Sequence, residues 1–160
     1  PTLLPMRYRI RPFGSKEEIP AKYNLYNARI ESLLEKNTWK NLMGKKHAAI
    51  PMAGFNEWVS TETGKKIVQF KVKNLDLFWC AGLYDIWENI ETKSKLITFA
   101  IITTKPTSYI ESVGHDRCPV ILGPKSINNW IQGSQTPENA LSLLPKSMDP
   151  LEFSHEFTVV

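Results

Sequence analysis

Two long apolar runs constrain the fold of this 160-residue chain more than any other feature: residues 77–87 (LFWCAGLYDIW) and residues 96–104 (LITFAIITT). Both are rich in aromatic and β-branched residues, as expected of central strands that are covered on both faces. The polar residues 88–95 (ENIETKSK) between them predict a hairpin loop. We therefore expect these two strands to form the middle of a sheet and of the hydrophobic core.

Shorter strand patterns flank this pair. Residues 68–73 (VQFKVK) alternate with period two, which predicts that Val68, Phe70 and Val72 are buried while Gln69, Lys71 and Lys73 face water. Residues 45–60 indicate two short strands around Pro51 and Gly54, followed by a turn at 61–66 (TETGKK), and residues 151–160 predict a closing strand.

Helical patterns are short and lie between the strands. Residues 27–42 carry Ile30, Leu33, Leu34 and Leu42 at roughly helical spacing, with Asn27 placed to cap a helix. Residues 106–114 predict one or two helical turns, and residues 123–131 and 136–144 two further helices; the last has Thr136 as its cap, Pro137 in its first turn and Glu138 suited to the helix dipole. The pattern as a whole predicts an α+β fold, a mainly antiparallel sheet surrounded by short helices.

The composition fits one domain that acts in a reducing compartment. A chain of this length buries a core without a metal or disulfide staple, and its formal charge of +4 permits an anionic partner. Cys80 and Cys118 lie in apolar surroundings, which favours inert buried thiols over a disulfide. We expect a cytoplasmic protein, because no apolar run approaches a membrane span and the start lacks the pattern of a signal peptide.

A few polar residues look out of place in this apolar framework. Glu57 shares a strand face with Phe55, and a carboxylate buried between Phe55 and Trp58 would have a raised pKa, which suits acid/base chemistry. His115, in the run GHDRCPVIL, would supply a second proton-transfer group near neutral pH. The ordinary alternatives are a solvent-facing glutamate, a surface histidine and, for Asn27, a simple helix cap.

Five blocks in order, NAR, IPMAGFNEW, FWCAGLYD, TFAIITT and GHDRCPVIL, closely resemble the SRAP family of SOS response-associated peptidases, or abasic-site processing proteins. The match extends from about Met6 through the helix with NNWI and to the final strand. The resemblance implies one domain over residues 1–160 and a curved or barrel-like sheet. It also implies binding of single-stranded DNA and covalent capture of the abasic-site aldehyde as a thiazolidine, by an N-terminal cysteine, in the response to DNA damage.

The resemblance assigns roles to matching positions of this chain. Asn27 would orient the cysteine and the sugar, Glu57 would transfer protons on the amine and imine, and His115 would serve ring opening of the deoxyribose. Arg29 and Arg117 would hold phosphates as bidentate cations, and base stacking near the lesion would rest on Phe13 or Tyr8. No cofactor or metal is implied, and the expected partner is single-stranded DNA bound by a monomer.

The chain also departs from the family pattern. No cysteine lies near its start, so we expect this chain to lack the N-terminal segment that carries the nucleophile. Cys118 has no free amine, and Pro1 aligns far from the leading cysteine. In the segment YRIRPFG, Arg9 takes the place of a glycine and Gly14 that of the second aromatic residue, and Asn56 stands where the family commonly has an aromatic residue.

Two other functions stay open at this stage. One is a non-catalytic relative that binds single-stranded DNA without crosslinking, and the other is a cysteine-type peptidase or autopeptidase served by Glu57 and His115. The lysine pairs 45–46 and 65–66 are typical of solvated faces or would extend a phosphate track. The histidines and cysteines lack paired metal-ligand spacing.

Overall fold

The computed structural model describes residues 2–132, 136–145, 148 and 151–158, and Pro1 lies outside this part. The two long apolar runs form strands β6 (Phe78–Glu88) and β7 (Lys95–Thr104), which pair antiparallel around the predicted polar loop. Strand β3 (His47–Met52) pairs antiparallel with the other edge of β6. The predicted central hairpin is therefore confirmed.

The remaining strands of this seven-stranded sheet are very short. β1 (Arg7–Tyr8) and β2 (Asn27–Arg29) both run parallel to β7. β8 (Cys118–Pro119) pairs with the last residues of β7, and β9 (Ile121–Leu122) pairs with the first residues of β6. The segment 118–122 thus bridges the ends of the two central strands, at the point where β6 and β7 no longer pair with each other.

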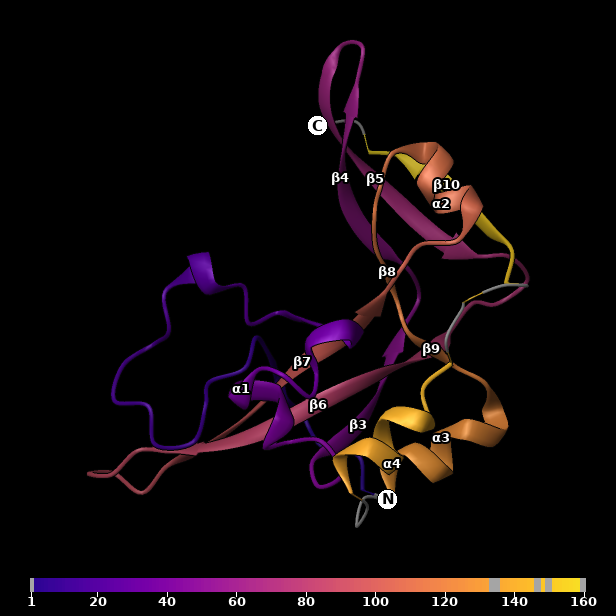
Figure 1. The fold of residues 1–160 in the computed structure, drawn as a ribbon. Coiled ribbons are helices and arrows are strands. Elements are labelled where there is room, and N and C mark those ends of the chain that lie inside the picture. Colours follow the sequence, from indigo (N-terminus) through magenta and orange to yellow (C-terminus); the bar gives the residue numbers. More distant parts are fainter. Residues whose placement is uncertain (1, 133–135, 146–147, 149–150, 159–160) are drawn as a thin grey trace.

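A second sheet of three strands has the order β10-β5-β4 and lies above the central sheet in Figure 1. β4 (Phe55–Thr61) and β5 (Gly64–Val72) form the hairpin predicted around residues 61–66, and β10 (Phe153–Phe157) is the predicted closing strand. Gly54 connects β3 to β4 where the backbone passes close to β5, since a Cβ there would lie 2.7 Å from the carbonyl oxygen of Phe70.

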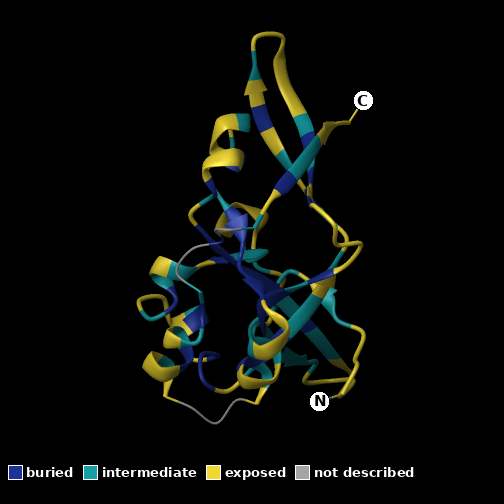
Figure 2. Cartoon of the chain, turned by 90° about the vertical axis from the view of Figure 1, so that its right-hand side faces the viewer, coloured by how far each residue is buried: buried dark blue, intermediate teal, exposed yellow. Residues whose placement is uncertain are grey.

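The α+β class is confirmed, and six of the eight strand pairs in the described part of the chain are antiparallel. The barrel-like arrangement is not what the structure shows, because the strands form two sheets that do not close into a barrel. The alternation predicted for residues 68–73 is confirmed for Val68, Phe70 and Val72, which are buried, and for Lys71 and Lys73, which are exposed, whereas Gln69 is half-buried. Figure 2 shows the buried strand segments in dark blue within the body of the molecule and the tip of the β4–β5 hairpin exposed.

The helix predicted over residues 27–42 is wrong. Its first three residues form β2, and they are followed by the 3-10 turn η2 (Ile30–Ser32) and the single turn of α1 (Asn37–Lys40). Pairing with β7 satisfies the backbone of β2 and buries Ala28 completely, so tertiary contacts override the local helical spacing. Asn27 is consequently a strand residue and caps no helix.

The other helices agree with the sequence. They are α2 (Ser108–Val113), α3 (Pro124–Ile131) and α4 (Pro137–Ser142). A further 3-10 turn that was not predicted, η1 (Ala21–Tyr23), precedes β2. Thr136 caps α4 by accepting a hydrogen bond from the Asn139 amide, as predicted. In Figure 1, α3 and α4 lie together beside β3, whereas α2 lies next to the second sheet.

Candidate functional site

Glu57 and His115 meet where α2 approaches β4. Helix α2 ends at Gly114, whose left-handed φ of 103° lets its amide and that of His115 bond back to the carbonyl oxygens of Glu111 and Ile110. This turn lies against β4, because a Cβ on Gly114 would be 3.7 Å from the Cβ of Val59. His115 Nε2 then lies 3.4 Å from Glu57 Oε2.

This pair has the electrostatics of a proton-transfer site. The Glu57 carboxylate facing the ring raises the pKa of His115 above its ordinary value; burial opposes the increase, whereas the Asp116 charge and the Trp58 backbone support it. The two side chains are 15% and 31% exposed, so both remain accessible to a small reactant. The arrangement favours an imidazolium that donates a proton and a carboxylate that accepts one.

Trp58 does not help to bury Glu57, contrary to the sequence-based interpretation. Phe55, Glu57 and Val59 are every second residue of β4 and lie on one face of it. Trp58 projects from the opposite face, and 60% of its surface is exposed. Trp58 is therefore a candidate binding residue that the sequence analysis missed. The signal was present, because the same period-two rule that buries Phe55 turns Trp58 outward.

A second polar pair lies at the edge of the central sheet. The hydroxyl of Tyr8 donates a 2.9 Å hydrogen bond to Oδ1 of Asn27, and the Tyr8 ring stacks on Phe99 with centroids 5.1 Å apart. Burial, followed by the negative charge of Glu57, raises the pKa of Tyr8 to about 12. The Glu57 charge thus raises the pKa of both Tyr8 and His115.

Arg29 lies on the same face of β2 as Asn27, and both line a cavity of about 650 Å³. Tyr23, Lys36 and Trp39 contribute to the wall of this cavity. Arg29 is exposed, so its guanidinium is available to an anion in or beside the cavity. The cavity is thus cationic and has an aromatic wall, and it adjoins the Tyr8–Asn27 pair.

Arg117 is more engaged than a free phosphate clamp would be. Its Nη1 and Nη2 donate 3.0 Å hydrogen bonds to the two carboxylate oxygens of Glu31, and Nη2 also donates to the carbonyl oxygen of Thr103 at 2.7 Å. The hydrogen bonds from Arg117 to the Glu31 carboxylate lower the pKa of Glu31. Arg117 therefore ties η2 to the end of β7, and any phosphate at this residue competes with Glu31.

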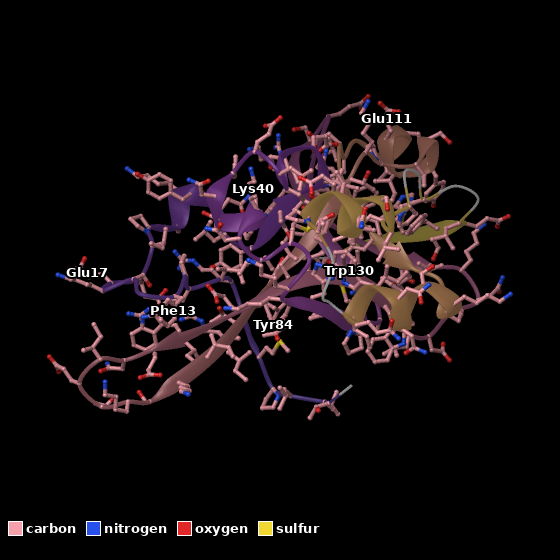
Figure 3. All side chains as sticks on the ribbon, turned by 60° about the horizontal axis from the view of Figure 1, so that its bottom comes forward. Phe13, Glu17, Lys40, Tyr84, Glu111 and Trp130 are labelled. Carbon is pink, nitrogen blue, oxygen red and sulfur yellow. The ribbon has the colours of Figure 1, made fainter. Side chains whose placement is uncertain are left out.

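Phe13 is not among the residues that line the cavity, although the preceding Pro12 is. It is 72% exposed in the loop after β1, and its amide donates a 2.9 Å hydrogen bond to the carboxylate of Asp85. In Figure 3, Phe13 and Glu17 lie on the opposite side of the molecule from Glu111 of α2. Of the two candidate stacking residues, only Tyr8 contacts another candidate site residue.

The two cysteines are buried, and within the described part of the chain neither forms a disulfide. Burial raises the pKa of the Cys80 thiol, which disfavours the reactive thiolate. Among the described residues, no group of three histidine, cysteine or acidic side chains is arranged to hold a metal ion. None of the helices described is both long enough and apolar enough to cross a membrane.

Comparison of the chain with known proteins gives matches to one family. The family model described as SOS response associated peptidase (SRAP) matches residues 1–157. The abasic site processing proteins YobE and YoqW of Bacillus subtilis (strain 168) are 36% and 38% identical to the chain over 150 and 146 residues. These matches cover 92% and 89% of this chain, but 67% and 63% of the relatives.

Solved structures show the same fold. A crystal structure of a protein from Bacteroides thetaiotaomicron superposes with a TM-score of 0.79 at 26% identity, covering 95% of this chain and 67% of that one. A protein from Bordetella bronchiseptica superposes with a TM-score of 0.75 at 19% identity, covering 97% and 76%, which supports the fold alone. Because the family model spans nearly the whole chain and relatives above 30% identity match it, the chain belongs to the SRAP family.

Proposed function

We propose that residues 1–160 form one domain of an abasic-site processing protein, which acts on single-stranded DNA in the cytoplasm as part of the DNA damage response. The family membership and the names of the relatives support this role. The observation that carries the mechanism is the Glu57–His115 pair at 3.4 Å. The Tyr8–Asn27 hydrogen bond supports it, because the Glu57 charge acts on the pKa of Tyr8 as well. The nucleophile in this proposal is an N-terminal cysteine, which residues 1–160 do not include.

The proposed chemistry captures the aldehyde of the abasic sugar. His115, whose pKa is raised by Glu57, donates a proton to the ring oxygen O4′ as the C1′–O4′ bond of the deoxyribose breaks. The C1′ hydroxyl loses its proton to water, which leaves the aldehyde. The cysteine amine adds to the aldehyde carbon and water leaves, giving an imine. The thiol sulfur then adds to the imine carbon while its proton passes to the imine nitrogen, which closes a thiazolidine. Glu57 takes the proton released from the amine, and Asn27, oriented by the Tyr8 hydroxyl, positions the sugar.

The surroundings of the site suit a strand of single-stranded DNA. Arg29 and Lys36 place cations on the cavity beside Asn27, and Trp58 offers an exposed ring on the strand that carries Glu57. Phosphate contacts of this kind give affinity without reading sequence, and aromatic stacking tolerates every base. We therefore expect a monomer that binds DNA strands of any sequence and reacts only at an abasic site.

The decisive experiment uses the complete protein with its leading cysteine and an oligonucleotide that contains one abasic site. Glu57→Gln and His115→Ala should slow the appearance of a crosslink on denaturing gels by about 10²–10⁴-fold. Both should leave affinity for an undamaged strand nearly intact. Normal crosslinking by the double variant would refute the catalytic assignment and leave both residues as scaffold.

The same experiment separates the two alternatives. A binding-only relative gives no crosslink even as wild type. A peptidase gives cleavage of a peptide that depends on Glu57 and His115 and needs no DNA. The 160-residue chain alone should bind the strand weakly and form no stable crosslink, because its two cysteines are buried. A covalent species from this chain would point to Pro1 or Cys118 as the nucleophile.

A further inference from the structure

Three arginines gather around one carboxylate in the segment that follows Met6. Arg7 donates hydrogen bonds of 2.6 and 3.3 Å to the two oxygens of Glu18, and Arg11 donates one of 3.4 Å. Arg9 bonds to the neighbouring carbonyl oxygen of Ile19, and its charge also contributes to the lowered pKa of Glu18. Three cations thus face one anion, and the cluster keeps an excess of positive charge.

The guanidinium groups of this cluster are not fully used. The Nε atoms of Arg7, Arg9 and Arg11 are buried, and none has a hydrogen-bond partner among the residues that the structure describes. Buried donors without partners are costly, and a cluster of them indicates a group that the bare chain lacks. Guanidinium groups match the paired oxygens of a phosphate as well as those of a carboxylate.

The arginine cluster (Arg7, Arg9 and Arg11) includes one residue with a strained backbone conformation. Arg9 has a φ of 94°, in the left-handed region that a residue with a side chain rarely adopts. The guanidinium of Arg11 stacks over Trp87 at 3.5 Å, and the Trp87 indole donates to the carbonyl oxygen of Ser15. Strain in one arginine and a fixed orientation of another are more typical of a prearranged binding site than of a solvated charged surface.

The position of the cluster connects it to the candidate site. Tyr8 lies between Arg7 and Arg9 in sequence and bonds to Asn27. Pro12, next to Arg11, and Ile19, next to Glu18, line the cavity that Asn27 and Arg29 also line. A DNA strand that passes this cavity would therefore bring a backbone phosphate to the arginines.

We propose that Arg7, Arg9 and Arg11 form a second binding site for a DNA backbone phosphate, and that Glu18 occupies this site in the free protein as a carboxylate in place of the phosphate. This inference rests on the proposed function. Glu18 lies outside any helix or strand, and its side chain is 42% exposed. Its ion pairs are thus weak enough for a phosphodiester to displace them.

The neighbouring Glu17 provides a matched control. It is exposed, and no ion pair to it is found within the described part of the chain, so Glu17→Gln and Glu18→Gln change the net charge equally but only the second releases the arginines. Affinity for an undamaged fluorescent oligonucleotide would be measured by anisotropy over a series of chloride concentrations. We expect Glu18→Gln to bind about three- to fivefold more tightly than Glu17→Gln at low salt.

The salt dependence gives a second readout. One additional phosphate contact should steepen the slope of log K against log salt by about 0.7 in Glu18→Gln. Adding Arg7→Gln to Glu18→Gln should remove both the gain and the steeper slope. In the wild-type background, Arg7→Gln should weaken binding more than Lys93→Gln, which changes the charge equally in the β6–β7 loop; this comparison remains valid if Glu18→Gln proves unstable.

Each other outcome has a defined meaning. Equal affinities of Glu17→Gln and Glu18→Gln, with DNA still bound, overturn this inference and leave Glu18 as a structural counter-ion. Loss of the Glu18→Gln gain in inorganic phosphate, compared with chloride of equal ionic strength, assigns the cluster to free phosphate and overturns the DNA assignment. If neither the wild type nor any variant binds the strand, the proposed function fails together with the inference.

Discussion

Arg117 holds Glu31 with two hydrogen bonds of 3.0 Å, although the two residues are 86 positions apart in the sequence. The family resemblance predicts that Arg117 binds a phosphate, whereas in the structure its guanidinium binds the Glu31 carboxylate. Arg29, by contrast, is exposed beside the cavity. The two arginines are therefore expected to differ in what their removal does.

Arg117→Ala should lower the free energy of unfolding by about 1–2 kcal/mol, because it removes the contacts to Glu31 and to the Thr103 carbonyl. Arg29→Ala should leave stability unchanged within experimental error. Both should weaken DNA binding equally across sequences and flatten its salt dependence. Denaturant unfolding together with anisotropy titrations checks this; unchanged binding in Arg117→Ala would mean that its role is structural only.

Glu57→Gln should lower the pKa of His115 toward its ordinary value near 6.5, because the Glu57 carboxylate is the main cause of the increase. The raised pKa stabilises the fold fully below the unfolded value, and this contribution is lost as pH rises through the folded pKa. An NMR titration of the His115 ring in both proteins measures the shift directly. Identical titrations would show that the 3.4 Å contact does not couple the two groups.

The contribution of His47 to stability should have the opposite pH dependence to that of His115, because its pKa is lowered. Its Nδ1 donates to the Trp130 carbonyl oxygen at 2.7 Å and its Nε2 accepts from the Gly44 amide at 2.8 Å, and burial lowers its pKa. The neutral His47 ring therefore stabilises the fold at pH values above its pKa in the unfolded chain, near 6.5. This contribution to the free energy of unfolding is lost as the pH falls from there through the lower pKa of the folded protein. Thermal unfolding between pH 7 and 5 should show less acid sensitivity in His47→Gln than in wild type; equal sensitivity would exclude His47 as the group responsible.

Trp58→Ala should weaken binding of undamaged single-stranded DNA by about 1–3 kcal/mol if one base stacks on its ring. Trp58→Phe should restore much of the affinity. The melting temperature should change little, because most of the Trp58 surface is exposed. Ile90→Ala, at an exposed apolar residue of the β6–β7 loop, is the control and should bind like wild type; a similar loss in both variants would speak against stacking on Trp58.

Strands with a strong local signal were predictable. The apolar runs of β6 and β7, the alternation in β5 and the turns between them fix these elements, because each depends on side chains that lie close together in sequence. The cap and first turn of α4 were predictable for the same reason. The identity of the candidate site residues came from the order of the sequence blocks and their family resemblance, and not from periodicity.

Contacts between distant segments determined the features that local sequence patterns did not predict. Residues 27–29 have helical spacing after them, yet they become β2 because β7 offers a backbone to pair with. The meeting of Glu57 with His115 depends on the left-handed turn at Gly114 packing against Val59, and the closure of Arg117 on Glu31 depends on β8 joining β7. The sequence by itself determined the strands with strong local patterns, β5, β6 and β7, and which polar groups stand apart from the apolar runs. Contacts between distant segments determined β2 and the pairing of the polar groups, because the energy of these contacts depends on the packing of both sheets and on no single stretch of chain.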